Sequence, residues 1–143
     1  EVAYDILPVE NRYDSIGLGV IGQLEKPIDA VDFLSIVKST FNCQAIKYAG
    51  NTDKKVQRIA LCGGAGSSLI EEAAHSGADI YITGDIKYHQ FFDIGNQMIV
   101  ADIGHYESEQ FTKELFYEIV TNKFPKFAIR LSKVQTNPVK YLF

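Results

Sequence analysis

The chain has 143 residues, of which 46% are hydrophobic and 22% are charged, and its formal net charge at pH 7 is -4. This composition is ordinary for a folded domain and excludes a low-complexity or disordered chain. The basic residues are scattered singly apart from Lys54 and Lys55, so we expect no nucleic acid among the partners.

The apolar runs are far shorter than the ~20 residues that a membrane-spanning helix needs, so we expect no membrane association. The two cysteines, Cys43 and Cys62, lack the CxxC spacing of redox and zinc motifs. Cys62 ends an apolar run, where a buried free thiol is the common outcome. These features favour a reducing compartment, and we expect a cytoplasmic protein.

Residues 1–25 predict an extended N-terminal segment that continues from a missing upstream region. Residues 2–6 alternate like a strand that has already begun, and the chain does not start with methionine. A connector follows in which three glycines alternate with apolar residues, at Gly17, Gly19 and Gly22. This connector is the predicted boundary to an α/β domain over residues 26–143.

A helix is predicted after Asp29, which is a favoured N-cap residue. Its apolar residues recur at helical spacing and predict a buried face of Ala30, Phe33, Leu34, Val37 and Phe41. A short strand is predicted next, over 45–48.

Further short apolar strands are predicted at 58–62, 80–83 and 98–102. Each leads through a loop into a helical segment. Ser68 and Glu71 have the spacing of a capping box for the first of these helices, which should end at Gly77. The second segment is short, and the last predicts an apolar face of Phe111, Leu115, Phe116, Ile119 and Val120. A final strand is predicted over 126–131.

Short apolar strands alternating with helices predict an α/β fold with three layers, in which a largely parallel sheet has helices on both faces. In open sheets of this kind, ligands bind beyond the carboxyl ends of the strands. The loops at those ends carry most of the unusual polar residues of the sequence. We therefore expect a functional site at this edge of the sheet.

The segment "GHYESE" (104–109) carries a histidine and two glutamates. Acidic residues are favoured at the start of a helix, which explains Glu107 without any ligand. His105 and Glu109 are four residues apart and lie ~40° from each other on one helical face, whereas Glu107 points ~200° away from His105. An imidazole with a carboxylate suits Zn, Fe, Mn, Co or Ni better than Ca. The pair is a candidate metal site, although two ligands are too few to complete one.

The segment "TGDIKYH" (83–89) places Asp85, Lys87 and His89 directly after a strand. These residues are candidates for general acid/base catalysis, substrate contact or support of a metal ligand. The structural alternative is that Asp85 caps the following helix, Lys87 is solvated and His89 packs its ring. Both interpretations stay open on the sequence alone.

The turn "CGGAGSSL" (62–69) is a weak candidate for anion binding, because backbone N–H groups at a helix start can hold a phosphate. Its candidate residues are Gly63, Gly64, Gly66 and Ser67. The dinucleotide motif fails because Leu69 stands where a third glycine is needed, and the Gly-Lys-Ser/Thr of a phosphate loop is absent. His75 is most simply a surface residue near the end of its helix.

Three motifs in this order, "LCGGAGSS" (61–68), "ITGDIKYHQ" (82–90) and "DIGHYESE" (102–109), resemble the C-terminal half of the NIF-three-like dinuclear metal-centre family. Members of this family are described as homologues of GTP cyclohydrolase 1 type 2. The opening "EVAYDILPVEN" and "GLGVIGQL" also resemble the junction after a domain that is inserted in some bacterial members. The resemblance spans nearly the whole chain.

The resemblance implies a site for two divalent metal ions that is built from both halves of a longer protein. The C-terminal half supplies a histidine and a glutamate, which correspond to His105 and Glu109. A His-His pair and an aspartate belong to the N-terminal half, and this chain contains no adjacent histidines. The resemblance also implies a homo-oligomer, a hexamer in the family.

The expected function is a metal-binding protein, with metal-dependent hydrolysis of a nucleotide or a phosphoester-like substrate as the candidate reaction. The alternative is a regulatory or interaction module without turnover, in which the metal only has a structural role. Fold similarity does not establish a reaction, so the sequence leaves open whether the protein is an enzyme.

Overall fold

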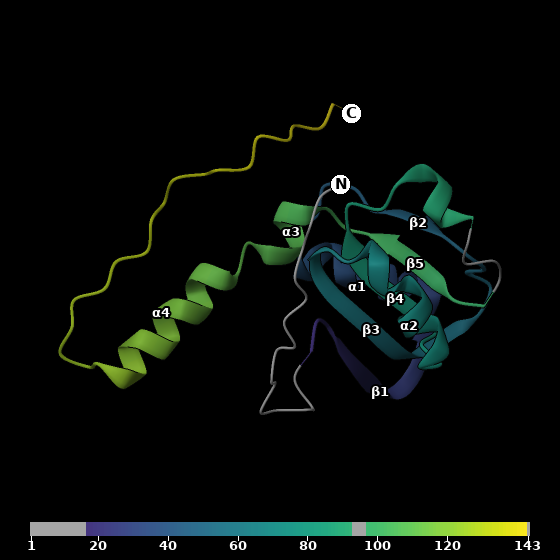
Figure 1. Cartoon of the computed structure of the whole chain (residues 1–143), viewed down its shortest axis with the longest axis horizontal. Coiled ribbons are helices and arrows are strands. Elements are labelled where there is room, and N and C mark those ends of the chain that lie inside the picture. Colours follow the sequence, from purple (N-terminus) through teal and green to yellow (C-terminus); the bar gives the residue numbers. More distant parts are fainter. Residues whose placement is uncertain (1–16, 93–96, 143) are drawn as a thin grey trace, which may run out of the picture.

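The structure is a computed structural model that describes residues 17–92 and 97–142 (Figure 1). Its strands are β1 (Val20–Asp29), β2 (Lys47–Ala49), β3 (Lys55–Ala65), β4 (Ile80–Gly84) and β5 (Ile99–Asp102). They form one sheet in the order β1-β3-β4-β5-β2. The central strands β3, β4 and β5 are parallel, whereas the edge strands β1 and β2 are antiparallel to their neighbours. The predicted α/β class is confirmed, but the sheet is mixed rather than largely parallel.

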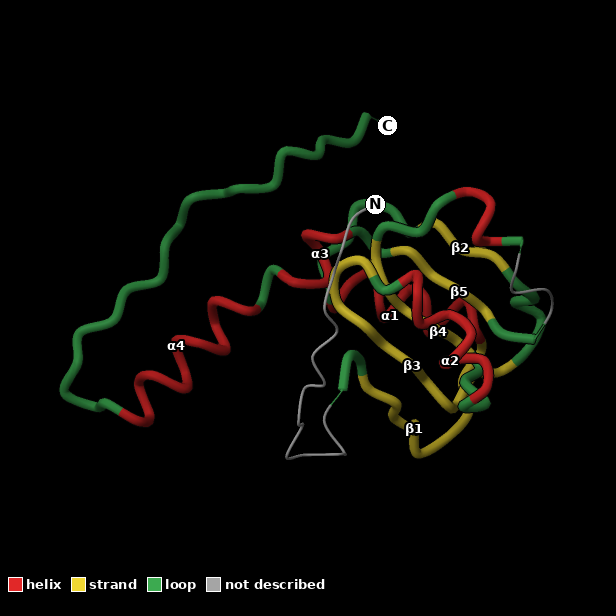
Figure 2. The backbone as a smooth tube through the Cα atoms, in the orientation of Figure 1, coloured by secondary structure: helices red, strands yellow, loops and turns green. Residues whose placement is uncertain are grey.

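The helical segments alternate with these strands (Figure 2). They are α1 (Ala30–Thr40), η1 (Ser67–Leu69), α2 (Ile70–His75), η2 (Tyr88–Phe91), α3 (His105–Glu109) and α4 (Thr112–Lys123). In the described part of the chain, no helix is both long and apolar enough to cross a membrane.

Two hydrophobic clusters pack against the sheet, and successive residues of β4 belong to one cluster and then the other. Ile80 and Ile82 of β4 belong to a cluster with α1, and Tyr81 between them belongs to a cluster with α2. Successive side chains of a strand point to opposite faces, so each face of the sheet has its own core. All residues of β4 and β5 are buried, which explains why these strands are continuous apolar runs in the sequence.

The N-terminal predictions have different outcomes. The predicted strand over 2–6 lies outside the described residues. Part of the predicted glycine-containing connector forms the edge strand β1, which pairs with β3. Gly22 lies within this strand, and Gly17 and Gly19 lie just before it. Helix α1 is confirmed, with Asp29 at its N-cap position and Phe41 only partly buried at its C-cap. The remaining four residues of the predicted face are buried.

Two local predictions are wrong. No side-chain cap forms at the start of α2, so Ser68 and Glu71 make no capping box, although the chain does turn at Gly77 with a positive φ of 75°. No strand forms over 126–131 among the residues that the structure describes. Helix α4 forms, but none of its residues is buried, and Leu115 is 56% exposed.

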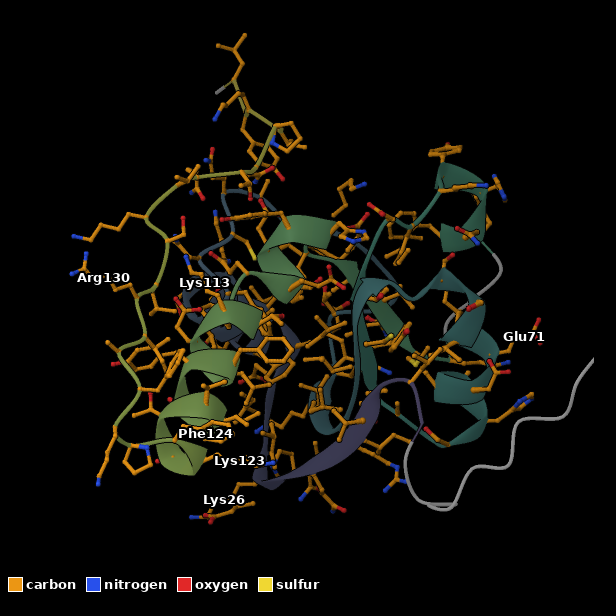
Figure 3. All side chains as sticks on the ribbon, turned by 60° about the vertical axis from the view of Figure 1, so that its left-hand side comes forward. Lys26, Glu71, Lys113, Lys123, Phe124 and Arg130 are labelled. Atoms are coloured by element: carbon orange, nitrogen blue, oxygen red, sulfur yellow. The ribbon has the colours of Figure 1, made fainter. Side chains whose placement is uncertain are left out.

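The exposure of α4 follows from its position. It extends away from the sheet, and the segment after it is irregular (Figures 1 and 3). Phe124 at its C-cap is 54% exposed, and Lys123 Nζ lies 5.9 Å from the centroid of its ring. The apolar periodicity of this segment therefore predicts its helix correctly but not its burial.

Candidate metal centre

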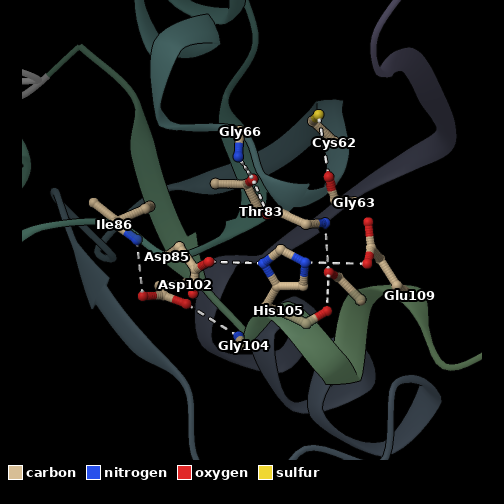
Figure 4. A network of polar contacts seen from close by, with 12 residues as sticks. Cys62, Gly63, Gly66, Thr83, Asp85, Ile86, Asp102, Gly104, His105 and Glu109 are labelled. Atoms are coloured by element: carbon tan, nitrogen blue, oxygen red, sulfur yellow. Dashed lines mark hydrogen bonds and ion pairs between the residues drawn. The ribbon is translucent and has the colours of Figure 1, made fainter.

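The predicted pair His105 and Glu109 lies at the carboxyl end of β5, on the short helix α3 (Figure 4). The chain leaves β5 through Gly104, whose φ of 94° suits glycine and lets the helix begin at His105. His105 Nε2 lies 3.1 Å from Glu109 Oε2, and each side chain is 51% exposed. The structure therefore brings the two predicted ligands together on one face of the helix.

Asp85 holds the other side of the histidine ring. Its Oδ2 lies 2.7 Å from His105 Nδ1. Asp85 follows β4, and its positive φ of 56° is a left-handed conformation that aspartate tolerates better than most residues. Parallel strands β4 and β5 end at the same edge of the sheet, which is why two loops far apart in sequence meet here.

The surroundings of His105 are acidic. The pKa of His105 is raised above its usual value, chiefly because Asp85 hydrogen-bonds the ring, and also because Asp85 and Glu109 are negatively charged. The Asp85 contact is the shorter of the two, at 2.7 Å against 3.1 Å, so we expect the proton of the neutral ring on Nδ1 and the Nε2 lone pair toward Glu109.

The glycine-rich turn after Cys62 packs against α3, which carries His105 and Glu109. The Gly64 N–H donates to Ser108 Oγ at 2.8 Å, and that hydroxyl donates to the His105 carbonyl at 2.8 Å. A Cβ on Gly64 would lie 2.6 Å from Glu109 Oε1. The turn thus makes room for the glutamate, a role that the sequence analysis missed because only the folded chain brings positions 64 and 109 together.

Two of the four anion-binding candidates in this turn use their N–H groups within the chain. Gly64 donates to Ser108, and Gly66 donates to Thr83 Oγ1 at 2.9 Å. Gly63 lies in β3, and Ser67 begins η1. The observed hydrogen bonds give this turn a structural role, and its anion binding stays a prediction.

Of the three catalytic candidates, only Asp85 reaches the histidine. Lys87 and His89 are exposed at η2, and within residues 17–92 and 97–142 neither side chain has a hydrogen bond or ion pair with His105. The backbone N–H of Lys87 donates to Gln90 Oε1 at 2.9 Å, which orders the start of η2. The roles of Lys87 and His89 in catalysis stay predictions.

Glu107 faces the interior and is only 6% exposed. It stands in the first turn of α3, but no side-chain cap hydrogen bond forms there, and its carboxylate accepts from Asn137 Nδ2 and the Tyr141 hydroxyl instead. Burial, together with the charge of Glu107, raises the pKa of the Cys43 thiol to about 11 and also raises the pKa of Tyr141. Glu107 is therefore a buried structural acid, separate from the exposed His105–Glu109 pair.

A cavity of about 930 Å³ lies beside the pair. Its wall includes Asp85, His105 and Glu109 on one side and residues of the C-terminal segment, such as Thr136 and Tyr141, on the other. The candidate ligands therefore face a space large enough for a small molecule.

The donor set fits part of a metal site. An imidazole nitrogen and a carboxylate oxygen 3.1 Å apart are close enough to contact the same divalent ion, and the ring is oriented by a second carboxylate. No group of three or more histidine, cysteine, aspartate or glutamate side chains that could hold a metal ion occurs in the described part of the chain. Further ligands would have to come from elsewhere.

Comparison with known proteins gives a family match over most of the chain. The family model described as Duf34/NIF3 (NGG1p interacting factor 3) matches residues 3–138. The chain is 35% identical over 153 aligned positions to a GTP cyclohydrolase 1 type 2 homolog of Bacillus subtilis, covering 99% of this chain and 39% of that protein. It is 34% identical over 139 positions to the protein of the same description in Staphylococcus epidermidis, covering 92% and 37%.

Solved structures show the same relationship. A Bacillus cereus protein related to NIF3 is similar with a TM-score of 0.76 and 31% identity, covering 98% of this chain and 40% of that one. Staphylococcus aureus protein SA1388 is similar with a TM-score of 0.77 and 29% identity, covering 88% and 42%. The chain thus spans about two fifths of the length of the relatives that it matches.

Proposed function

The chain belongs to the Duf34/NIF3 family, and on that premise we propose that His105 and Glu109 are ligands of a dinuclear metal centre. We propose that this centre serves metal-dependent hydrolysis of a nucleotide or a phosphoester-like substrate. The observation that carries the proposal is the arrangement around His105, whose Nδ1 is held by Asp85 while Nε2 faces the Glu109 carboxylate.

This arrangement supports a ligand role for His105 on chemical grounds. Metal-binding histidines nearly always donate their second ring N–H to a carboxylate, a carbonyl or water, which fixes the tautomer and raises the basicity of the ligating nitrogen. Asp85 is placed for that role at 2.7 Å. Nitrogen with carboxylate oxygen suits Zn, Fe, Mn, Co or Ni, among which the proposal does not choose.

The residues of this chain have distinct parts in the proposed reaction. Divalent ions, when bound, lower the pKa of water to near neutrality and stabilise negative charge on a phosphate or carbonyl oxygen. His105 and Glu109 would hold an ion, and Asp85 would keep the His105 ring in the tautomer that binds it. Gly64 leaves space for Glu109, and the adjacent cavity would admit the substrate.

Metal uptake by the purified chain tests the ligand assignment. Replacing both His105→Ala and Glu109→Ala should lower the affinity for Zn²⁺ or Co²⁺ by at least about tenfold, as measured by equilibrium dialysis. Glu71→Ala with His75→Ala is a matched control, because these exposed residues of α2 are also four apart, and no ion pair between them occurs in the part of the chain that the structure describes. Figure 3 labels Glu71 at the surface. Equal metal affinity in the two double variants would contradict the assignment.

The alternative function, a regulatory or interaction module, is favoured by one observation. The described residues supply only a two-ligand pair and no complete metal group. Turnover of a nucleotide and phosphoester panel, with and without a chelator, separates the alternatives. Hydrolysis that the chelator abolishes supports the enzyme, whereas metal binding without any turnover supports the module.

Two structural expectations belong to the same proposal. We propose that the protein forms a homo-oligomer, as the family resemblance implies, and that its domain has three layers with α1 and α2 on opposite faces of the sheet. Light scattering tests the first, and a monomeric mass at all concentrations would contradict it. An experimental structure tests the second.

A further inference from the structure

Asp102, the last residue of β5, is a buried acid close to the candidate metal centre. Its side chain is only 2% exposed, and burying a carboxylate is costly unless charge and hydrogen bonds compensate. It has three partners (Figure 4 draws the two backbone contacts). The Ile86 N–H donates to Oδ2 at 3.2 Å, the Gly104 N–H donates to Oδ1 at 3.0 Å, and Lys47 Nζ lies 2.7 Å from Oδ2.

The two backbone donors belong to the two loops that build the site. Ile86 directly follows Asp85, and Gly104 directly precedes His105. One carboxylate therefore joins the loop that carries the orienting acid to the loop that carries the histidine. Ile86 is 16 residues from Asp102 in the sequence, and Gly104 is 2 residues from it.

The backbone has a positive φ in both loops, and only at Asp85 does a side chain make that conformation costly. Asp85 has a φ of 56° and Gly104 a φ of 94°, and left-handed backbone costs a non-glycine residue about 1–2 kcal/mol. The loops also approach closely, since a Cβ on Gly84 would lie 2.9 Å from the Gly104 carbonyl carbon and the His105 nitrogen. Fixed hydrogen bonds at this crossing hold both conformations in place.

Lys47 supplies the compensating charge. It lies on the edge strand β2, directly opposite Asp102 in the antiparallel register with β5. Its side chain is 68% exposed, so the ammonium group remains hydrated while it pairs with the buried acid. Both residues of the Asp102–Lys47 pair thus lie on paired strands of the sheet.

We propose that Asp102 is a positioning residue that sets the Asp85–His105 contact, and thereby the direction of His105 Nε2, with Lys47 as its counter-ion. Its importance for metal binding rests on the proposed function. The juxtaposition of the two loops by Asp102 does not, because it can be measured on the metal-free chain.

The test compares Asp102→Asn with Asp79→Asn. An asparagine amide can accept from only one of the two N–H groups, and its NH₂ would face the other. Asp79 is a matched control, since its carboxylate also accepts from two backbone N–H groups, those of Gln57 and Arg58, at 2.8 Å each. Asp79 precedes β4 and lies at the opposite end of that strand from the site.

The readout is the pair of ring-nitrogen chemical shifts of His105, recorded by long-range ¹⁵N–¹H correlation at one pH at which the ring is neutral. We expect the Nδ1–H tautomer in the unmodified chain and in Asp79→Asn, and a shift toward the Nε2–H tautomer in Asp102→Asn. An unchanged tautomer in Asp102→Asn, or the same change in both variants, would overturn the proposal. Melting temperatures alone do not discriminate, because both variants replace a charged acceptor of backbone N–H groups with a neutral one.

Amide hydrogen exchange of the unmodified chain keeps the proposal testable if Asp102→Asn does not fold. We expect the Ile86 and Gly104 amides to be protected at least tenfold relative to unfolded peptides. Exchange of either amide at the unfolded rate would overturn the proposal. Failure of metal uptake, by contrast, would contradict only the proposed function.

Discussion

At the scale of single residues, His105 has a carboxylate beside each ring nitrogen, and these two charges control its protonation. Asp85 contacts Nδ1 and Glu109 contacts Nε2, so the protonated ring is stabilised and its pKa is raised. A metal ligand must be neutral at the ligating nitrogen. Metal uptake by this pair should therefore weaken as the pH falls below the raised pKa of His105.

Replacing Asp85→Asn should lower the pKa of His105, because the amide carries no negative charge. Asparagine tolerates the left-handed backbone at this position, so the fold should persist. NMR titration of His105 in both proteins measures the effect. A midpoint of His105 that does not fall would contradict the role of Asp85.

The same contact makes stability depend on pH. Because the pKa of His105 is raised on folding, its contribution to stability is complete below the unfolded-state value of about 6.5 and is lost as the pH rises through the folded-state value. The free energy of unfolding of the wild type should therefore fall more than that of Asp85→Asn over this range. Urea denaturation at a series of pH values measures the difference, and parallel curves would contradict the prediction.

Gly64→Ala should damage the site beyond its effect on the backbone. Gly64 has a φ of 64°, and an added Cβ would lie 2.6 Å from Glu109 Oε1. Gly77→Ala is a matched control, with a φ of 75° and no atom within 4 Å of its added Cβ. Both variants should lose about 1–2 kcal/mol of stability, but only Gly64→Ala should weaken Zn²⁺ binding. Equal Zn²⁺ affinity in the Gly64→Ala and Gly77→Ala variants would contradict the proposal that Gly64 leaves space for Glu109.

At the scale of elements, the central strands of the sheet are buried whereas α4 is exposed. Ile99 of β5 is fully buried, whereas Leu115 of α4 is 56% exposed. We expect Ile99→Ala to cost about 2–5 kcal/mol, because it leaves a cavity in a packed core. Leu115→Ala should cost less than about 1 kcal/mol. Comparable losses in urea denaturation would show that α4 is packed in solution.

The elements that the sequence predicts correctly are those whose pattern reflects local packing. Alternation of buried strands with helices predicts the three parallel central strands and α1. The four-residue spacing of His105 and Glu109 predicts their shared face. The carboxyl-end rule also predicts that Asp85 lies near them, because it depends only on the order of parallel strands.

The elements that it misses depend on contacts between distant segments. Pairing with β3 makes β1 a strand despite Gly22, and residues 126–131 pair with none of the strands that the structure describes. The supporting role of Gly64 and the bridge through Asp102 depend on side chains brought together from different loops. No local pattern of the sequence encodes those distances.

At the scale of the whole molecule, the chain spans about two fifths of its relatives, and its site is correspondingly incomplete. The sheet places the two proposed metal ligands, and the acid that contacts the histidine ring, at one edge beside a cavity. The central claim is that this edge binds a divalent ion through His105 Nε2.

The most direct measurement is a Zn²⁺ titration of the ¹⁵N-histidine-labelled chain, followed by the ring-nitrogen shifts of its three histidines. We expect the chemical shift of His105 Nε2 to move to that of a metal-bound nitrogen while Nδ1 stays protonated. His75 and His89 should not change. Binding through His75 or His89 with no change at His105, or loss of the Nδ1 proton of His105, would contradict it.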